Sequence, residues 1–453
     1  MVATAQFSDQ HKRTLVVGLG ATGLSVARYL MKQGVRVAIA DSRAQPPGFD
    51  ALKAIDPDIA VFLGDFDDAV FEQADMLVVS PGVPMSTPQI KAALARGVSV
   101  IGDVELFVHA ASAPVVAITG SNGKSTVTTL LGEMAKASGV NVAVGGNIGT
   151  PALCLLNDEV ELYVLELSSF QLETTYSLQA AVATVLNVSA DHMDRYGDLD
   201  DYAAAKAVVM QGAGLGVYNA DDDAVMGMSG SDDAWFFTLG QSYSDKTFGV
   251  RQVEGRDVLC RGDQFLIAAN DVLIPGKHNI ANALAALAMG SALGFELPAM
   301  IEVLKKFPGL AHRSEFVADI NDVRWYNDSK ATNVGATLAA LYGMKNDDGG
   351  RAVIIMGGDC KDGDFTELTK ALTDCARGVI LFGRDAAQIA AVIPAGCEVA
   401  HAQDMDEAVA RAAEMAHAGD HVLLSPACAS FDRYKNFAER GDVFMSTVRR
   451  FLS

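Results

Sequence analysis

The sequence predicts an α/β protein built from three domains. At 453 residues the chain is too long to bury a single hydrophobic core. Three of its segments each restart an alternation of short β-branched runs and amphipathic helical stretches, which is the pattern of α/β domains. We therefore expect domains over residues 1–102, 103–308 and 309–453.

The first segment begins with an apolar run at Thr14–Gly20, followed by a helical pattern over Thr22–Lys32. Gly34 is expected to end this helix, because glycine readily adopts the positive φ of a helix C-terminus. A second predicted strand ends at Asp41. Further apolar runs at 74–80 and 98–102 complete the segment as predicted strands.

The second segment opens with the apolar run Pro114–Gly120, and the third follows a turn signal at Phe307–Leu310. A β-rich, turn-rich stretch from about Ala234 to Ile274 precedes a long predicted helix after Pro275. The other predicted strands are Glu161–Ser168, Ala181–Val188, Arg351–Gly358, Gly378–Gly383 and His421–Ala427.

Composition excludes several classes of protein. A formal charge of −21 repels nucleic-acid backbones, so we expect no nucleic-acid partner. No apolar run approaches the ~18 residues that span a bilayer, so we expect no membrane insertion and a cytoplasmic location. We also expect a monomer. Six scattered cysteines without a CxxC pair are typical of reduced thiols and argue against zinc or a disulfide framework.

The string TGSNGKST at Thr119–Thr126 lies where a predicted strand meets a predicted helix. A glycine-rich turn there lets backbone N–H groups point at phosphate oxygens, and the helix N-terminus adds positive potential. Lys124 is expected to reach the β- and γ-phosphates and the Ser125 hydroxyl to bind Mg²⁺. The spacing departs from GxxxxGK[ST], because Ile118 replaces the first glycine. The expected nucleotide-binding residues of this loop are Gly120, Ser121, Asn122, Gly123, Lys124, Ser125 and Thr126.

This loop predicts ATP or GTP binding, but by itself it fits a kinase or an ATPase equally well. Gly18, Gly20 and Gly23 form a second pattern, GxGxxG, with Asp41 placed for a ribose hydroxyl. The same geometry accepts any diphosphate, including that of a nucleotide sugar, and also occurs in turns without a ligand. This segment alone therefore leaves a nicotinamide cofactor and a UDP-sugar both open.

Acidic and histidine side chains follow two predicted strands of the second segment. Glu166 lies near the end of one, and the string DHMDRY containing His192 follows the next. Mg²⁺ favours carboxylate ligands and neutralises phosphate charge, so Glu166 and His192 are candidate metal-shell residues. A surface acid and an ordinary loop histidine fit the spacing as well. Lys206, four residues after Tyr202 on a predicted helix, is by itself a solvated lysine.

Taken together, the strings of this chain resemble the Mur ligase family, and within it the branch that adds D-glutamate. The resemblance covers essentially the whole chain, in matching order. Besides TGSNGKST, it is carried by GGNIGTP (145–151), ELSSFQLE (166–173), NVSADHMDRY (187–196), GKHNIANALAA (276–286), GLAHRSE (309–315), NDSKATN (327–333), GGDCKDGDF (357–365) and LLSPACASFDRYKNFAERGDVF (423–444).

The resemblance implies a Rossmann-like first domain that holds UDP, a central P-loop ATPase-like domain, and a Rossmann-like C-terminal domain that completes the ATP and D-glutamate sites. The implied activity is ATP-dependent joining of D-glutamate to the L-alanine carboxylate of UDP-N-acetylmuramoyl-L-alanine through an acyl phosphate. This is a step of peptidoglycan precursor synthesis. The implied cofactors are ATP and two Mg²⁺ ions, with Mn²⁺ as a substitute. Because the first domain of relatives holds UDP, the resemblance favours a UDP-sugar over NAD at the GxGxxG segment.

The resemblance also assigns site residues. Lys124, His192 and Lys206 would be catalytic, with Ser125 and Glu166 on one metal ion and His192 and a carbamylated Lys206 on the other. The ATP nucleotide would be surrounded by Asn279, Asn282, Arg313, Asp328 and Lys330. The expected substrate-binding residues are Gly18 and Asp41 for UDP, Asn147 and Ser168 for the muramoyl group, and Thr332, Lys361, Ser425 and Phe431 for D-glutamate.

Three alternatives remain at this point. A folylpolyglutamate-type ligase shares the phosphate loop and the acyl-phosphate chemistry, but is expected to lack the SPACASFD string and the GxGxxG segment. A nucleotide-gated binding protein has no need of Glu166, His192 and Lys206 together. An NAD-dependent oxidoreductase would bind NADH.

Overall fold

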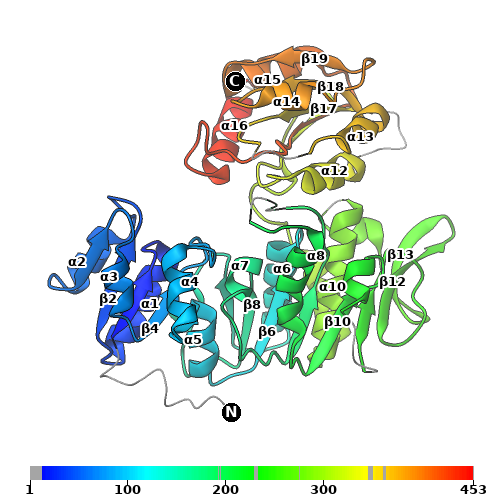
Figure 1. Ribbon diagram of the computed structural model, residues 1–453. Helices are drawn as coiled ribbons and strands as arrows, with labels where there is room; N and C mark the ends of the chain where they lie inside the picture. The colour runs from blue at the N-terminus through cyan, green and yellow to red at the C-terminus, as the bar shows by residue number, and fades with distance from the viewer. Residues whose placement is uncertain are drawn as a thin grey trace.

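The computed structural model of the protein describes residues 13–191, 193, 195–228, 233–274, 276–344, 350–360 and 364–451. Within these residues, three β-sheets with flanking helices follow one another along the chain. The N-terminal and central units lie side by side, and the C-terminal unit is stacked beyond the central one (Figure 1).

The N-terminal unit is a five-stranded parallel sheet in the order β3-β2-β1-β4-β5. β1 and β4 are buried along their whole length, as expected of parallel strands covered on both faces. The strand order reverses between β1 and β4, where an open α/β sheet leaves a ligand crevice at the strand ends. Its elements are β1 (Thr14–Val17), α1 (Ala21–Lys32), β2 (Val37–Asp41), α2 (Phe49–Ile55), β3 (Ala60–Leu63), α3 (Asp68–Glu72), β4 (Met76–Val79), α4 (Pro88–Ala95) and β5 (Ser99–Ile101).

Helix α5 (Asp103–Ala110) connects this unit to the central one. The ring of Phe107 packs edge-on against that of Tyr163, with centroids 5.0 Å apart. One hydrophobic core contains Val16 of the first sheet together with Phe107 and Tyr163. The first two units are therefore packed through a shared core.

The central unit is a nine-stranded sheet in the order β14-β13-β12-β11-β10-β9-β6-β8-β7. Its strands are parallel from β7 to β12, and β12, β13 and β14 form antiparallel pairs. Its elements are β6 (Val115–Thr119), α6 (Lys124–Ala137), β7 (Val142–Gly146), β8 (Leu162–Glu166), α7 (Ser169–Leu172), β9 (Val182–Val185), α8 (Leu199–Ala207), β10 (Leu215–Asn219), α9 (Asp223–Met226), β11 (Trp235–Phe237), β12 (Thr247–Val253), β13 (Arg256–Arg261), β14 (Gln264–Ala268), α10 (Lys277–Ala292) and α11 (Leu297–Leu304).

The C-terminal unit is a six-stranded sheet in the order β15-β16-β20-β17-β18-β19, parallel except for the β15–β16 pair. Its elements are β15 (Glu315–Ile320), β16 (Val323–Asn327), α12 (Val334–Gly343), β17 (Ala352–Met356), α13 (Leu368–Cys375), β18 (Ala376–Leu381), α14 (Ala386–Ala390), β19 (Glu398–His401), α15 (Met405–Met415), β20 (His421–Leu424) and α16 (Phe437–Phe451).

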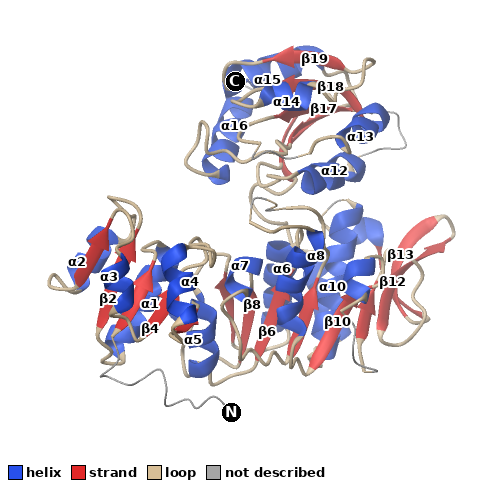
Figure 2. Ribbon diagram, viewed as in Figure 1, coloured by secondary structure: helices blue, strands red, loops and turns tan. Residues whose placement is uncertain are grey.

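Helices and strands are mixed in all three units, which confirms the predicted α/β class (Figure 2). All strands of each sheet fall inside one of the three predicted ranges, and the division at residues 102 and 308 remains our proposal. Among the described residues, no helix combines the length and apolar character needed to cross a membrane.

Candidate active site

The phosphate loop lies between β6 and α6, at the carboxyl edge of the central sheet. Gly123 caps α6 with a φ of 83°, a left-handed conformation that favours glycine. A Cβ atom at Gly123 would lie 2.3 Å from Asn282 Oδ1, so a larger residue would displace that side chain. The loop is held in place by Asn187, whose side-chain and backbone oxygens accept hydrogen bonds from the backbone N–H groups of Asn122 and Ser121.

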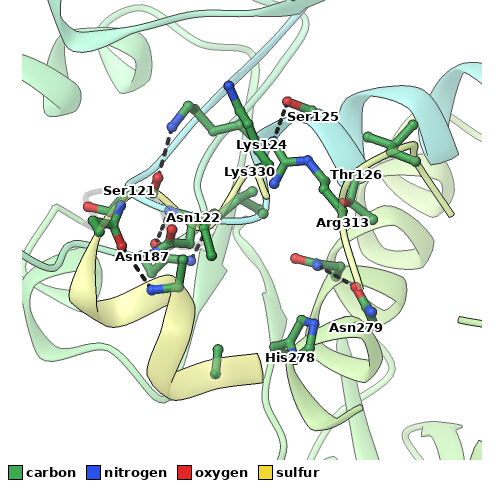
Figure 3. A pocket seen from close by; sticks show the side chains of 18 of the residues that line it. Ser121, Asn122, Lys124, Ser125, Thr126, Asn187, His278, Asn279, Arg313 and Lys330 are labelled. Carbon is green, nitrogen blue, oxygen red and sulfur yellow. Dashed lines mark hydrogen bonds between the residues drawn. The ribbon is translucent and has the colours of Figure 1, made fainter. Parts of the chain in front are cut away.

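A cavity of about 430 Å³ opens over this loop and is lined by both the central and C-terminal units. Lys124 Nζ lies at its wall and donates hydrogen bonds to the carbonyls of Gly120 and Ser121, at 2.8 and 2.9 Å. Burial lowers the pKa of Lys124, although the charges of Glu166 and Asp191 oppose this. Figure 3 shows Lys124 close to Lys330 and Arg313 of the C-terminal unit.

Two cations of the C-terminal unit complete this wall. Arg313 Nη2 donates a hydrogen bond of 2.8 Å to Ser125 Oγ, which links the two units directly. Lys330 Nζ lies 4.0 Å from the centre of the Phe437 ring, and its pKa falls to about 8 through burial and then the charge of Arg313. Three cationic groups from two units therefore face one cavity, which suits a polyphosphate.

Asp328 lies behind these cations. It accepts hydrogen bonds from the Ser314 N–H and the Ser425 hydroxyl, at 3.1 and 2.9 Å. Burial nevertheless raises the pKa of Asp328 to about 7. The carboxyl group is thus half protonated near neutral pH.

Glu166, at the end of β8, has an oxygen suited to a metal ion. Its side chain is 2% exposed, and Oε1 accepts a 2.6 Å hydrogen bond from Asn147 Nδ2. Among the described residues, Glu166 Oε2 has no hydrogen-bond partner. A buried carboxylate oxygen without a donor, beside the Ser125 hydroxyl in the same cavity, fits a hard divalent cation.

Lys206 is buried beside the phosphate loop, which corrects the interpretation from its spacing alone. Its side chain is 1% exposed, and Nζ donates a 3.0 Å hydrogen bond to the Gly120 carbonyl. The ammonium lies 4.2 Å from the centre of the Tyr202 ring. Burial, reinforced by the charge of Lys124 and opposed by that of Asp191, lowers the pKa of Lys206 to about 6. It is not a solvated lysine but a largely neutral amine at pH 7.

A second cavity, of about 500 Å³, lies at the crevice between β1 and β4 and is lined by Gly18 and Asp41. Gly18 has a φ of 96°, and a Cβ atom at Gly23 would lie 1.8 Å from the Gly18 carbonyl oxygen, so this turn requires glycine at both positions. Asp41 accepts hydrogen bonds from the Leu19 N–H and the Arg43 side chain, which fix the cavity wall.

Asn147 lines both cavities, so the two sites meet at this residue. The predicted residues Ser168, Thr332, Asn279 and Asn282 line the cavity over the phosphate loop. So do the loop residues Ser121, Asn122, Gly123, Ser125 and Thr126, whereas Gly120 takes part through its carbonyl.

Two predicted D-glutamate residues lie off this cavity. Ser425 is buried behind Asp328, to which its hydroxyl donates. Phe431 is 66% exposed on the C-terminal unit. The predicted residues His192 and Lys361 lie outside the described residues.

Comparison with known proteins explains this arrangement. Residues 12–102 match the Mur ligase MurD-like N-terminal domain, 118–290 the Mur ligase middle domain, and 312–428 the Mur ligase glutamate ligase domain. A UDP-N-acetylmuramoylalanine–D-glutamate ligase from Nitrosococcus oceani is 51% identical over 97% of each chain. The chain belongs to the Mur ligase family. A protein of the same name from Methylobacillus flagellatus is 51% identical over 96% of each chain.

Solved structures show the same fold. The UDP-N-acetylmuramate-alanine ligase from Thermotoga maritima superposes with a TM-score of 0.61 at 19% identity, covering 98% of this chain and 99% of that one. MurF from Acinetobacter baumannii gives a TM-score of 0.61 at 17% identity, covering 98% and 93%. The three-unit architecture is therefore that of the Mur ligases, and the chain is an ATP-dependent ligase.

Four residues of this Mur ligase site were missed as individual candidates by sequence reasoning. Asn187 anchors the phosphate loop, and Asp191 accepts a 3.1 Å hydrogen bond from Asn333 across the two units. His278, on α10, lines the cavity, and burial lowers its pKa to about 4. All four lie inside the strings that carried the resemblance, so the sequence pointed to these segments but assigned no role to these four residues.

Proposed function

We propose that this Mur ligase joins D-glutamate to the L-alanine carboxylate of UDP-N-acetylmuramoyl-L-alanine, while ATP becomes ADP and phosphate. The observation that supports this most is the meeting of two cavities at Asn147. One is built around a phosphate loop and three cations, and the other lies at a nucleotide-type crevice. The substrate is taken from relatives that are about half identical over nearly the whole chain.

The reaction needs activation, because attack of an amine on a free carboxylate would have to expel oxide. Phosphorylation of the L-alanine carboxylate by the γ-phosphate gives an acyl phosphate with a good leaving group. The amine of D-glutamate then displaces phosphate and forms the amide. Lys124, Arg313 and Lys330 would neutralise the negative charge that both steps bring together.

Mg²⁺, or Mn²⁺ in its place, would supply further neutralisation of the phosphate charge when bound. Ser125 and Glu166 would hold one ion, as the unpartnered Glu166 oxygen suggests. His192 and a carbamate on Lys206 would hold the other. A neutral amine is the form that reacts with CO₂, and the lowered pKa of Lys206 favours it.

The remaining assignments divide between the two cavities. Gly18 and Asp41 would bind the UDP part. The nucleotide of ATP would lie against Asn279, Asn282 and Asp328. We assign the muramoyl group to Asn147 and Ser168, and D-glutamate to Thr332, Lys361, Ser425 and Phe431. We propose that the enzyme acts as a monomer in the cytoplasm, in peptidoglycan precursor synthesis.

The decisive experiment measures phosphate release from ATP with UDP-N-acetylmuramoyl-L-alanine, comparing D-glutamate, L-glutamate and no amino acid. We expect release that depends on both the muramoyl nucleotide and D-glutamate. Release that depends on neither would reduce the protein to a P-loop ATPase and overturn the proposal. Phosphate release that needs the muramoyl nucleotide and an amino acid other than D-glutamate would support a ligase with a different amino-acid substrate.

The role of Lys206 has a separate test, in which bicarbonate is titrated into protein prepared free of CO₂. We expect wild-type activity to rise with bicarbonate, while Lys206→Ala stays at least about 100-fold below it at every concentration. The control is Lys136→Ala, which removes an exposed lysine of α6. Full activity in Lys206→Ala would remove this residue from the mechanism.

A further inference from the structure

Arg195 contacts one residue that lines each of the two cavities, Pro81 of the N-terminal unit and Phe170 of the central unit, and it belongs to none of the sites assigned above. We propose that Arg195 is a positioning residue, which holds the loop of the nucleotide cavity at Pro81 in register with the catalytic part of the central unit. The inference rests on the proposed function, because the substrate is expected to extend across both cavities.

The guanidinium of Arg195 makes contacts on three sides. Nη1 donates a 2.8 Å hydrogen bond to the Pro81 carbonyl, in the loop after β4 that lines the nucleotide cavity. Nη2 donates a 2.6 Å hydrogen bond to Glu173 Oε2, at the C-terminus of α7. Its central carbon lies 3.9 Å from the centre of the Phe170 ring, and Phe170 lines the cavity over the phosphate loop.

Burial makes the loss of these contacts more costly than the loss of a surface ion pair. The side chains of Arg195 and Glu173 are 13% and 18% exposed, so the pair is largely removed from water. Removing one member of a buried ion pair leaves the other charge without compensation, unlike at the surface. The planar guanidinium also fixes the relative positions of its three partners. Its N–H groups bond Pro81 and Glu173, and its central carbon lies over the Phe170 ring. A lysine could not make all three contacts.

A series of side-chain contacts connects Arg195 to Lys206 through two packed tyrosine rings. The Tyr196 hydroxyl donates a 2.6 Å hydrogen bond to Glu173 Oε1, and the Tyr196 ring lies 5.1 Å from that of Tyr202. Tyr202 in turn covers the Lys206 ammonium. A contiguous set of contacts therefore runs from Pro81 at the nucleotide cavity to the lysine beside the phosphate loop.

This geometry predicts that loss of Arg195 impairs the positioning of the muramoyl nucleotide but not the binding of ATP. Without Arg195, the Pro81 loop loses its bond to the central unit, and the UDP end of the substrate shifts relative to the phosphate loop. A displacement of about 1 Å can cost up to roughly 100-fold in rate. ATP does not reach the Pro81 loop in this assignment, so its binding should change little.

The test uses the full-length enzyme and the variants Arg195→Met, Arg195→Lys and Glu173→Gln. We expect Arg195→Met to raise the KM for UDP-N-acetylmuramoyl-L-alanine about 10-fold or more and to lower kcat, with the KM for ATP within about twofold. Arg195→Lys should recover little. Calorimetric titration with the muramoyl nucleotide alone should show the same loss of affinity without turnover.

A control is Arg377→Met, which breaks the partly buried ion pair of Arg377 with Asp420 in the C-terminal unit. It should lower the Tm without a selective change in either KM. The double variant of Arg195→Met with Glu173→Gln should be clearly less than additive, because both changes break one contact.

The inference is overturned if Arg195→Met keeps wild-type KM values and affinity while wild type is active, or if its only effect is a lower Tm. Should Arg195→Met fail to fold, Glu173→Gln decides by the same measurements. Loss of D-glutamate-dependent phosphate release in wild type would instead overturn the proposed function, and calorimetric binding of the nucleotide would still test Arg195 separately.

Discussion

Burial determines the protonation of the side chains around the phosphate loop. Desolvation lowers the pKa of Lys206 to about 6 and that of Lys330 to about 8, and raises that of Asp328 to about 7. Each change favours the neutral form, as expected where water is excluded. Bound polyphosphate would bring negative charge into this cavity and favour the cationic form of Lys330.

Asp328 predicts a pH dependence of stability. Its pKa is higher in the folded protein than the ~3.9 of an unfolded aspartate, so the folded state holds a proton that the unfolded state has released between about pH 4 and 7. The stabilisation from this group is present below that window and is lost as pH rises through 7. We compare the unfolding free energy of Asp328→Asn with that of wild type at each pH. We expect this difference to shift in favour of the variant by about 1–3 kcal/mol as the pH rises from 5 to 8.

Urea denaturation followed by fluorescence tests this, because Trp325 is buried on the strand that precedes Asp328. Asp319→Asn, on the exposed side of β15, is the control and should show no such gain. A constant difference between Asp328→Asn and wild type across this pH range would contradict the prediction.

Cys360 and Cys428 lie in contact inside the C-terminal unit. Both are buried, and their Sγ atoms lie 2.7 Å apart, close to the ~2.05 Å of a disulfide. Paired backbone hydrogen bonds between Asp359 and Ala429 hold the two loops together. Cys428 packs against Cys360 within the C-terminal unit.

We expect the oxidant diamide, which takes up one hydrogen atom from each thiol, to join these two residues slowly. The hydrogen bond with Cys360, and then burial, raise the pKa of Cys428, which disfavours the reactive thiolate. Mass spectrometry of tryptic fragments should find the Cys360–Cys428 link, and Cys360→Ser should abolish it. Recovery of both residues as free thiols after exhaustive treatment would refute the prediction.

At the scale of elements, the glycine at the start of α6 carries a testable constraint. Gly123 and Gly139 flank this helix with nearly equal φ angles of 83° and 81°. A Cβ atom would collide with Asn282 at the first position and meet nothing within 4 Å at the second. Alanine at either site should cost about 1–3 kcal/mol from backbone strain.

Only Gly123→Ala should also impair the enzyme, because it displaces Asn282 in the cavity over the phosphate loop. We expect its KM for ATP to rise about 10-fold or more, with Gly139→Ala unchanged. Measuring Tm and KM for both variants separates strain from function. Equal KM values in the two variants would show that Asn282 does not bind the nucleotide.

Several strands in the middle of the sheets were predicted, but the interior strands β10 and β16 were missed. β1, β4, β6, β8 and β17 are buried runs of apolar residues, which period and composition identify. Missed strands include the edge strands β3 and β19, which are largely exposed and carry no such pattern. An exposed edge strand is held by backbone hydrogen bonds to its neighbour, so its own sequence need not carry an apolar pattern.

At the scale of the whole molecule, the catalytic cavity depends on two units staying together. Arg313 bonds Ser125, and Asn333 bonds Asp191, across the junction. Phe431, assigned to the D-glutamate pocket, lies exposed and away from the cavity. We therefore expect the C-terminal unit to close further when the substrates bind.

Small-angle scattering measures this closure. The radius of gyration should fall when a non-hydrolysable ATP analogue and UDP-N-acetylmuramoyl-L-alanine are added together. ATP analogue with Mg²⁺ alone serves as the comparison. An unchanged radius of gyration, with binding of both ligands verified, would contradict closure and remove Phe431 from the pocket.

The sequence by itself determined the α/β class, the phosphate loop and the order of the strings that assign the chain to its family. These features are local, because each depends on residues close together in the chain. Only the tertiary structure decided that Lys206 is a buried amine rather than a solvated lysine, and that Arg195 contacts both Pro81 and Phe170, which line different cavities. Burial and contact between distant segments arise from packing, and the spacing of residues within a single helix or loop does not encode them.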